Sequence, residues 1–247
     1  GKTTISDHLL PFLFPSCEIL EIDDNNSSNV FANSKLIHKF ESITVKDAES
    51  KFLEDIVFRL LDDTEQVLVI DCGGGNDTRK VIQQIMQLDL GAFAEVTYIV
   101  PLMNSLNQAK NAVDMQELLK GRNVVYVLNN VANMNTIKED WVFWYGNQDL
   151  DIEGYYSILG KPKTLYVPAS PYFELSTLYN ETIGDFAQLA YAFNRIDYQK
   201  MIFQKCKGDK DLFAKEMRSY RPRELAKDFL NSFAETFKNE LDRKSVV

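Results

Sequence analysis

The chain begins with Gly1-Lys2-Thr3-Thr4, which matches the closing half of a Walker A phosphate loop. In such a loop the glycine lets backbone N–H groups point at phosphate oxygens, and the lysine brings a positive charge to the β- and γ-phosphates. The hydroxyl of Thr3 can bind Mg²⁺, and a helix that begins here directs the positive end of its dipole at the anion. The alternative is a chance sequence at a terminus, so further stretches have to support the interpretation.

Two apolar stretches that end in acidic residues give this support. Residues 67–71 read Val-Leu-Val-Ile-Asp and precede Cys72-Gly73-Gly74-Gly75, and residues 18–26 read Glu-Ile-Leu-Glu-Ile-Asp-Asp-Asn-Asn. A buried parallel strand delivers the residue at its carboxyl end to the edge of the sheet where doubly wound folds bind ligands. The alternatives are a turn or helix cap at Asp23-Asp24 and a flexible glycine loop. The order of the stretches favours a nucleotide-hydrolysing site.

The phosphate loop also decides the predicted fold, because such a loop connects a strand to a helix and begins with further glycines. We therefore expect residues upstream of Gly1 to supply these glycines and the central strand of a parallel sheet. After the first helix, strand-like runs alternate with amphipathic segments, as in parallel sheets with right-handed crossovers. The predicted fold is a doubly wound, mostly parallel α/β sheet flanked by helices, with a helical C-terminal extension.

The individual elements follow from the periodicity of the apolar residues. Helices are expected over residues 3–10, 34–40, 48–61, 78–88 and 105–119, and strands over residues 17–22, 42–45, 67–71, 96–101, 124–128 and 163–168. Pro11 and Pro15 are expected to end the first helix. Residues 133–160 look irregular, and core packing is the preferred interpretation of their clustered aromatic side chains. We predict a P-loop NTPase domain over residues 1–190 and a helical extension over residues 191–247 that packs on it.

Composition and charge argue against several classes of protein. The 247 residues are 45% apolar, and no apolar run approaches the ~20 residues of a membrane-spanning helix. Cys17, Cys72 and Cys206 form no CxxC pair, which argues against a disulfide framework and against a zinc or iron–sulfur site. These features predict a cytoplasmic protein without a transmembrane segment. The net charge of −9 argues against a broadly basic surface for nucleic acid.

Together these stretches resemble the ParA/MinD family of deviant-Walker P-loop ATPases, which belongs to the SIMIBI class. The resemblance covers roughly residues 1–190. The matching residues are Gly1-Lys2-Thr3-Thr4, Glu21-Ile22-Asp23, Ile70-Asp71-Cys72-Gly73-Gly74, Tyr98-Ile99-Val100-Pro101 and the asparagine after the strand at 124–128. The second lysine that characterises the family would lie before residue 1.

The resemblance implies ATP or ADP and Mg²⁺ as cofactors, and a role for each matching residue. Lys2 would hold the phosphates, Thr3 would bind Mg²⁺ and Thr4 would contact the α-phosphate. Asp23 would position the attacking water, and Asp71 would hold Mg²⁺ through a water molecule. The chemistry agrees, because phosphoryl transfer to water depends mainly on positioning and charge neutralisation. Lys2 and Asp23 are therefore the candidate catalytic residues.

The resemblance further implies that Gly73 and Gly74 sense the γ-phosphate and that Asn129 contacts adenine. The sequence departs from the family in both switch regions. Asp24-Asn25-Asn26 replaces the Pro-Gln that relatives usually carry, and a glycine-rich stretch replaces the commoner switch that contains proline. Residues 24–29 are polar and rich in turn formers, as in a mobile switch loop.

The family also implies partners. ATP would favour a homodimer, and a partner protein would stimulate hydrolysis. The cargo would be plasmid DNA, as in plasmid partition, or a conjugation or mobilisation complex. DNA could bind directly through the one basic concentration, for which a solvated face is the default interpretation: Arg218, Arg221, Arg223 and Lys227.

The helical tail and the overall activity keep alternatives open. An apolar residue recurs every fourth position in the tail, which indicates a docked helix, a dimer helix or, less favoured, a membrane-surface helix. These residues are Leu225, Phe229, Phe233, Phe237 and Leu241. The alternative functions are an ATP-dependent ligase of the dethiobiotin-synthetase kind and a nucleotide-binding module without turnover.

Overall fold

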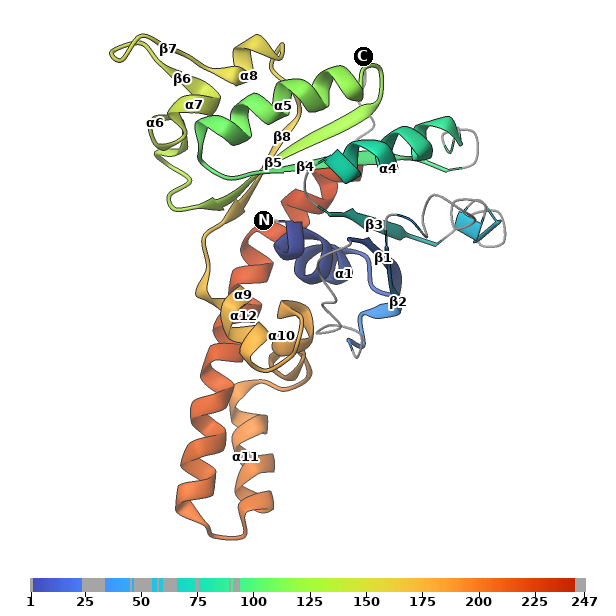
Figure 1. Ribbon diagram of the computed structural model, residues 1–247. Coiled ribbons are helices and arrows are strands. Elements are labelled where there is room, and N and C mark those ends of the chain that lie inside the picture. Colours follow the sequence, from blue (N-terminus) through green and yellow to red (C-terminus); the bar gives the residue numbers. More distant parts are fainter. Residues whose placement is uncertain are drawn as a thin grey trace. The chain divides into compact units, whose positions relative to one another are not determined.

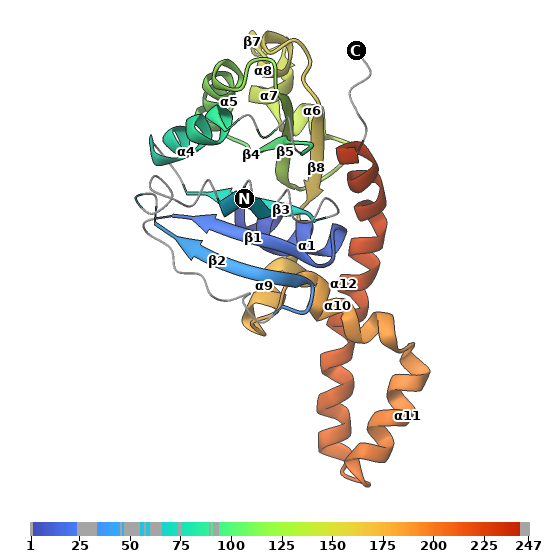
Figure 2. The same ribbon diagram turned by 90° about the vertical axis from the view of Figure 1, so that its right-hand side faces the viewer.

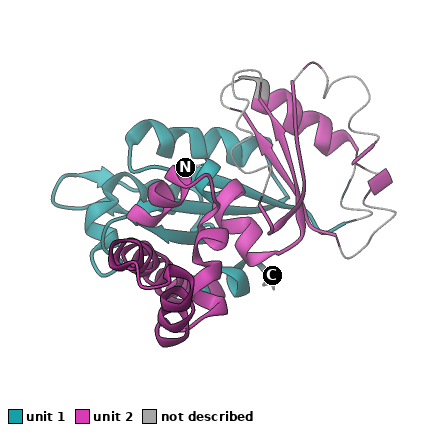
Figure 3. Ribbon diagram, turned by 90° about the horizontal axis from the view of Figure 1, so that it is seen from below, with its two compact units in different colours: residues 1–5, 89–170, 236–247 teal, residues 6–88, 171–235 magenta. Residues whose placement is uncertain are grey.

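Two three-stranded parallel sheets, with helices and a long C-terminal helix, form the framework of the chain (Figure 1). The computed structural model describes residues 2–23, 34–44, 46, 55–56, 58–59, 66–73, 76–88, 90 and 94–242. The chain divides into two compact units (Figure 3). The first unit contains residues 1–5, 89–170 and 236–247, and the second unit contains residues 6–88 and 171–235. The prediction of an α/β fold with parallel sheets is confirmed.

The sheet of the second unit has the strand order β2-β1-β3. Its strands are β1 (Cys17–Ile22), β2 (Ile37–Ile43) and β3 (Leu68–Cys72), and both pairings are parallel. Every residue of the central strand β1 is buried, as expected for a strand that neighbours cover on both sides. Both acid-tipped strands therefore form where the sequence predicted them, and they are direct neighbours.

The predicted helix over residues 34–40 is wrong, because β2 occupies most of that stretch. Apolar residues three apart, Ile37 and Phe40, imitate a helical period. In the strand, the register shifts where Cys17 pairs with Ile37 and Glu18 pairs with Lys39, so that His38 is an extra residue in β2. The shift returns Ile37 and Phe40 to one face, where both pack in a single apolar cluster with β1.

The helices of the second unit begin with η1 (Thr4–Leu9), a π-helix whose first two residues belong to the first unit and which continues into α1 (Leu10–Leu13). Pro11 does not end the helix as predicted, because it lies in the first turn of α1, where its missing N–H is not needed. The other helices are α4 (Asn76–Gln87), α9 (Pro171–Leu178), α10 (Ile183–Ala192), α11 (Arg195–Cys206) and α12 (Lys210–Asp242), whose last residues belong to the first unit. The helix predicted over residues 48–61 lies mostly outside the described residues.

The tail helices pack on the second unit through aromatic side chains. The ring of Phe229 on α12 meets the ring of Phe173 on α9 edge to face, with 5.7 Å between the centroids. The rings of Phe12 and Tyr191 lie 6.2 Å apart where α1 meets α10. Phe229, one residue of the predicted apolar stripe, therefore packs α12 against α9 of its own unit.

The sheet of the first unit has the order β4-β5-β8, also entirely parallel. Its strands are β4 (Thr97–Leu102), β5 (Asn123–Val131) and β8 (Thr164–Pro168), and α5 (Leu106–Leu118) connects β4 to β5. Short elements interrupt the stretch predicted to be irregular: α6 (Ile137–Asp140), α7 (Val142–Tyr145), β6 (Gly146–Asn147), β7 (Ile152–Glu153) and α8 (Tyr155–Ile158). Trp141 and Trp144 are buried, and the Trp144 ring lies 5.3 Å from that of Tyr126, so core packing is confirmed.

Among the described residues, no helix combines the length and the apolar character needed to cross a bilayer.

Candidate functional site

The carboxyl ends of β1 and β3 bring three of the predicted site residues together. Glu21 of β1 pairs with Asp71 of β3 in the parallel register, and Asp23 follows β1 directly. Gly73 follows β3, and its N–H donates to the carbonyl of Ile22 at 2.7 Å. A Cβ atom at position 73 would lie only 2.9 Å from Cγ of Asp23, so a glycine is needed for this approach.

The loop after β3 is tied to the helix that follows it. Thr78 Oγ1, in the first turn of α4, donates to the carbonyl of Gly73. The position of Gly73 is thus fixed from both sides, by Ile22 on β1 and by Thr78 on α4. Gly74, the second predicted switch glycine, and residues 24–29 lie outside the described residues.

Ser6 of η1 connects Asp71 to a second carboxyl group. Its Oγ lies 2.6 Å from Oδ2 of Asp71 and 2.6 Å from Oδ1 of Asp7. Ser6 and Asp7 are both buried. Since a hydroxyl has a single hydrogen, it can donate to only one of the two groups, and the other short contact requires a proton on the carboxyl.

Asp7 is the group suited to hold that proton. Burial raises its pKa to about 7, and the negative charges of Asp71 and Glu21 act in the same direction, against a smaller lowering by the Ser6 hydrogen bond. Protonated Asp7 can donate to Ser6 Oγ, which leaves the Ser6 hydrogen for Oδ2 of Asp71. This arrangement fixes the direction of one oxygen of Asp71.

The side chains at these strand ends fit a magnesium ion that takes most of its ligands from substrate phosphates and water. Within the described stretches, no three or more His, Cys, Asp and Glu side chains are grouped as a metal-binding cluster. Mg²⁺ in nucleotide sites is commonly held by one or two carboxylates together with substrate phosphates and water. A single oriented carboxylate such as Asp71 meets that requirement, and Glu21 is engaged by Ser42 Oγ, which donates to it at 3.0 Å.

The remaining predicted site residues belong to the first unit, apart from Gly1, which lies outside the described residues. Lys2 and Thr3 are helical and exposed, and Thr4 is the first residue of η1. Asn129 is buried in β5, and its Nδ2 lies 3.9 Å from Sδ of Met103. The second unit thus gathers Asp23, Asp71 and Gly73, and the first unit carries the loop residues and Asn129.

Sequence reasoning missed Ser6 and Asp7. The available signal was a carboxyl group between Ile5 and Leu9, two apolar residues that face the core. A charged side chain on an otherwise buried helix is rarely left without a partner. That pattern could have indicated a polar contact between η1 and the neighbouring strand ends.

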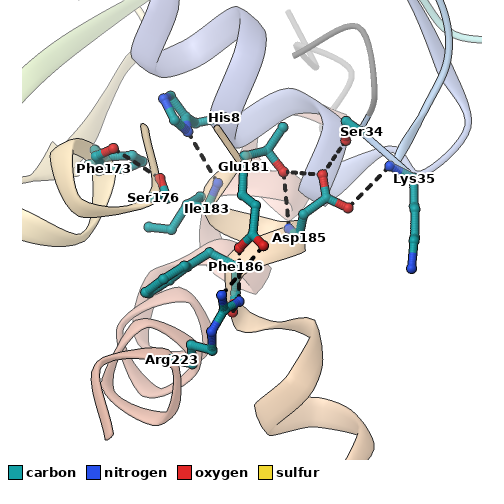
Figure 4. Close-up of polar contacts among 11 residues, drawn as sticks. His8, Ser34, Lys35, Phe173, Ser176, Glu181, Ile183, Asp185, Phe186 and Arg223 are labelled. Carbon is teal, nitrogen blue, oxygen red and sulfur yellow. Dashed lines mark hydrogen bonds and ion pairs between the residues drawn. The ribbon is translucent and has the colours of Figure 1, made fainter. Parts of the chain in front are cut away.

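His8 connects η1 to the helices α9 and α10 (Figure 4). Its Nδ1 accepts a hydrogen bond from the N–H of Ile183 at 3.1 Å, and its ring meets Phe173 edge to face at 5.6 Å. Burial lowers the pKa of His8 to about 4, so the ring is neutral at physiological pH. His8 therefore has a helix-packing role.

Two of the four cations considered for DNA make structural contacts inside the second unit. Arg223 pairs with Glu181 at 2.8 Å, donates to the carbonyl of Phe186 and lies 4.4 Å from the centre of its ring (Figure 4). Lys227 Nζ donates to the carbonyl of Ala190 at 3.0 Å. Arg221 pairs with Glu224, and Arg218 is exposed. Direct DNA binding through these four residues stays a prediction.

No family model, curated protein or solved structure matches the chain. The interpretation of the site therefore depends on the residues and the geometry given above.

Proposed function

We propose that the chain is a Mg²⁺-dependent P-loop ATPase of ParA/MinD type. One observation carries the proposal: Asp23, Asp71 and Gly73 meet at the carboxyl ends of two neighbouring parallel strands. Doubly wound folds bind their ligands at this edge. The Gly-Lys-Thr-Thr sequence at residues 1–4 supplies the matching phosphate-binding chemistry.

In the proposed site, each side chain acts through its position. Asp71 would hold Mg²⁺ through water, with Ser6 fixing the direction of Oδ2, and Thr3 would provide the hydroxyl ligand. Lys2 would bind the β- and γ-phosphates. When bound, Mg²⁺ supplies charge neutralisation for the transferred phosphoryl group.

Asp23 is suited to orient the attacking water, because the oxygens of a carboxylate are good hydrogen-bond acceptors. Gly73 lies against that carboxylate, so a shift of the loop after β3 would displace the Asp23 side chain. We propose that the γ-phosphate contacts this loop. ATP would favour a homodimer, a partner protein would stimulate hydrolysis, and the switch would position or segregate plasmid DNA or a DNA-transfer complex.

The proposal is tested by ATP binding and turnover in the full-length protein. Asp23→Ala should retain ATP binding and lose hydrolysis, and Asp71→Asn should raise the Mg²⁺ concentration needed for turnover. Asp149→Asn, an exposed acid of the first unit, serves as the matched control and should change neither property. Unchanged turnover in Asp23→Ala would remove that residue from the mechanism.

Two other outcomes would replace the proposal. Nucleotide binding without turnover, with and without DNA, would favour a binding module. Carboxylation of a diamine substrate at the expense of ATP would favour a ligase of the dethiobiotin-synthetase kind.

A further inference from the structure

The hairpin of α11 and the first half of α12 is a separate, well-packed part of the second unit. Figures 1 and 2 show that it extends beyond the sheet β2-β1-β3 and beyond α9 and α10. The rings of Tyr198 and Tyr220 stack at 4.3 Å between its two helices, and Ile202 and Cys206 are buried beside them. Tyr220 also donates to the carbonyl of Phe193 at 2.6 Å. The hairpin therefore needs no further partner to hold its own core together.

The outer face of α11 nevertheless carries large apolar side chains. Ile196 is 63% exposed and Phe203 is 66% exposed. Seven residues make almost two helical turns, so the two side chains lie on one face, with Lys200 beside them. Lys207 follows directly after α11, as its C-cap residue. The residues that pack on α12 occupy a different face of the same helix.

The face belongs to a basic segment of an acidic chain. Residues 195–218 contain seven Lys and Arg and four Asp and Glu, a net charge of +3, whereas the whole chain carries −9. The cations are Arg195, Lys200, Lys205, Lys207, Lys210, Lys215 and Arg218. None of them forms an ion pair with another of the described side chains.

We infer that this face, defined by Ile196, Lys200, Phe203 and Lys207, is a docking surface for an acidic amphipathic helix of another protein. A helix laid along α11 would cover Ile196 and Phe203 with its own apolar residues one heptad apart. Its carboxylates would lie near Lys200 and Lys207, which supply the charge complementarity. The inference does not depend on the nucleotide site.

Other occupants fit these observations less well. DNA phosphates would use the cations but would leave the exposed Ile196 and Phe203 uncovered. A membrane-surface helix needs a wide apolar face, whereas α11 offers two apolar side chains between lysines. A second copy of this chain would have to present an acidic apolar helix of its own.

The test places a photo-crosslinking residue, p-benzoylphenylalanine, at position 203 of the full-length protein in the cells from which the chain comes. Irradiation followed by mass spectrometry should identify a crosslinked segment of another protein with apolar residues at helical spacing and a net negative charge. The matched control carries the same residue at Leu178, which is 80% exposed at the end of α9, and should not yield that product. Circular dichroism and thermal unfolding verify that both variants are folded.

Charge reversal then tests the electrostatic part of the inference. Lys200→Glu combined with Lys207→Glu should lower the yield of that crosslink about tenfold, and Lys200→Arg combined with Lys207→Arg should retain it. A crosslink to DNA, to lipid or to a second copy of the chain would overturn the inference. A yield no greater than that of the Leu178 control, or a yield that charge reversal leaves unchanged, would also overturn it.

Discussion

Replacing His8 by asparagine should remove an acid-dependent loss of stability from the protein. The imidazole is 4% exposed and neutral, and its Nδ1 accepts the N–H of Ile183. An asparagine amide oxygen can occupy a similar position and accept the same hydrogen. The variant therefore retains the hydrogen bond, loses the ring contact with Phe173 and loses the titrating group.

The magnitude follows from the two pKa values of the imidazole. Burial lowers the pKa from 6.5 to about 4 in the folded state. Between these values the unfolded chain binds a proton that the folded chain does not, so stability falls as the pH falls from about 6.5 to about 4. At ~1.36 kcal/mol per pKa unit the full loss is about 3 kcal/mol, of which about 1.4 is reached at pH 5.5.

The assay is urea unfolding of wild type and His8→Asn between pH 7.5 and 4.5, with EDTA present and nucleotide absent. At pH 7.5 the variant should be about 1 kcal/mol less stable, because the edge-to-face contact is lost. The difference should shrink on acidification, vanish near pH 6 and favour the variant at pH 4.5. The other titrating groups are the same in both proteins, so their contributions cancel in the difference between the two unfolding free energies. A difference that stays constant over the whole range would refute the reasoning.

Three further substitutions test other contacts. Ser6→Ala should leave ATP binding unchanged and raise severalfold the Mg²⁺ concentration that turnover requires, as measured by titration of Mg²⁺. An unchanged requirement would contradict the proposal that Ser6 orients the Asp71 carboxylate. Gly73→Ala should lower the free energy of unfolding by about 1–3 kcal/mol, because its Cβ would overlap the Asp23 carboxylate, and unchanged denaturant stability would contradict this crowding. Arg223→Lys should cost about 1–2 kcal/mol in the same assay, since lysine cannot reproduce the paired N–H contacts and the ring stacking, and a neutral result would show that the charge alone matters.

The strands that form where they were predicted share a simple property. Residues 17–23 and 67–71 are short, mainly apolar runs with an acid at the end, and such runs have few alternatives to a parallel strand. The meeting of Asp23 and Gly73 could be anticipated because the carboxyl ends of parallel strands share one edge. The lack of room for a Cβ atom at position 73 beside Asp23 could not be anticipated, since it depends on the register between β1 and β3.

The failures also have physical causes. The spacing of Ile37 and Phe40 gives the same pattern in a helix and in a strand with one extra residue, and only the pairing with β1 separates the two. The bridge from Ser6 to Asp71 joins residues 65 positions apart, and no local pattern reports such a contact. Arg223 and Lys227 look like part of a basic patch in the sequence, whereas their partners come from α10 and from the turn before it.

The second unit is built from two separate stretches of chain, residues 6–88 and 171–235. During synthesis, β1, β2 and β3 therefore leave the ribosome well before α9 and α10, which supply the partners of His8. At about 5–20 residues per second, the intervening residues 89–170 take on the order of 4–16 s to translate. For that interval the nascent N-terminal sheet lacks its helical cover, which makes it a natural client for a chaperone that binds exposed apolar strands.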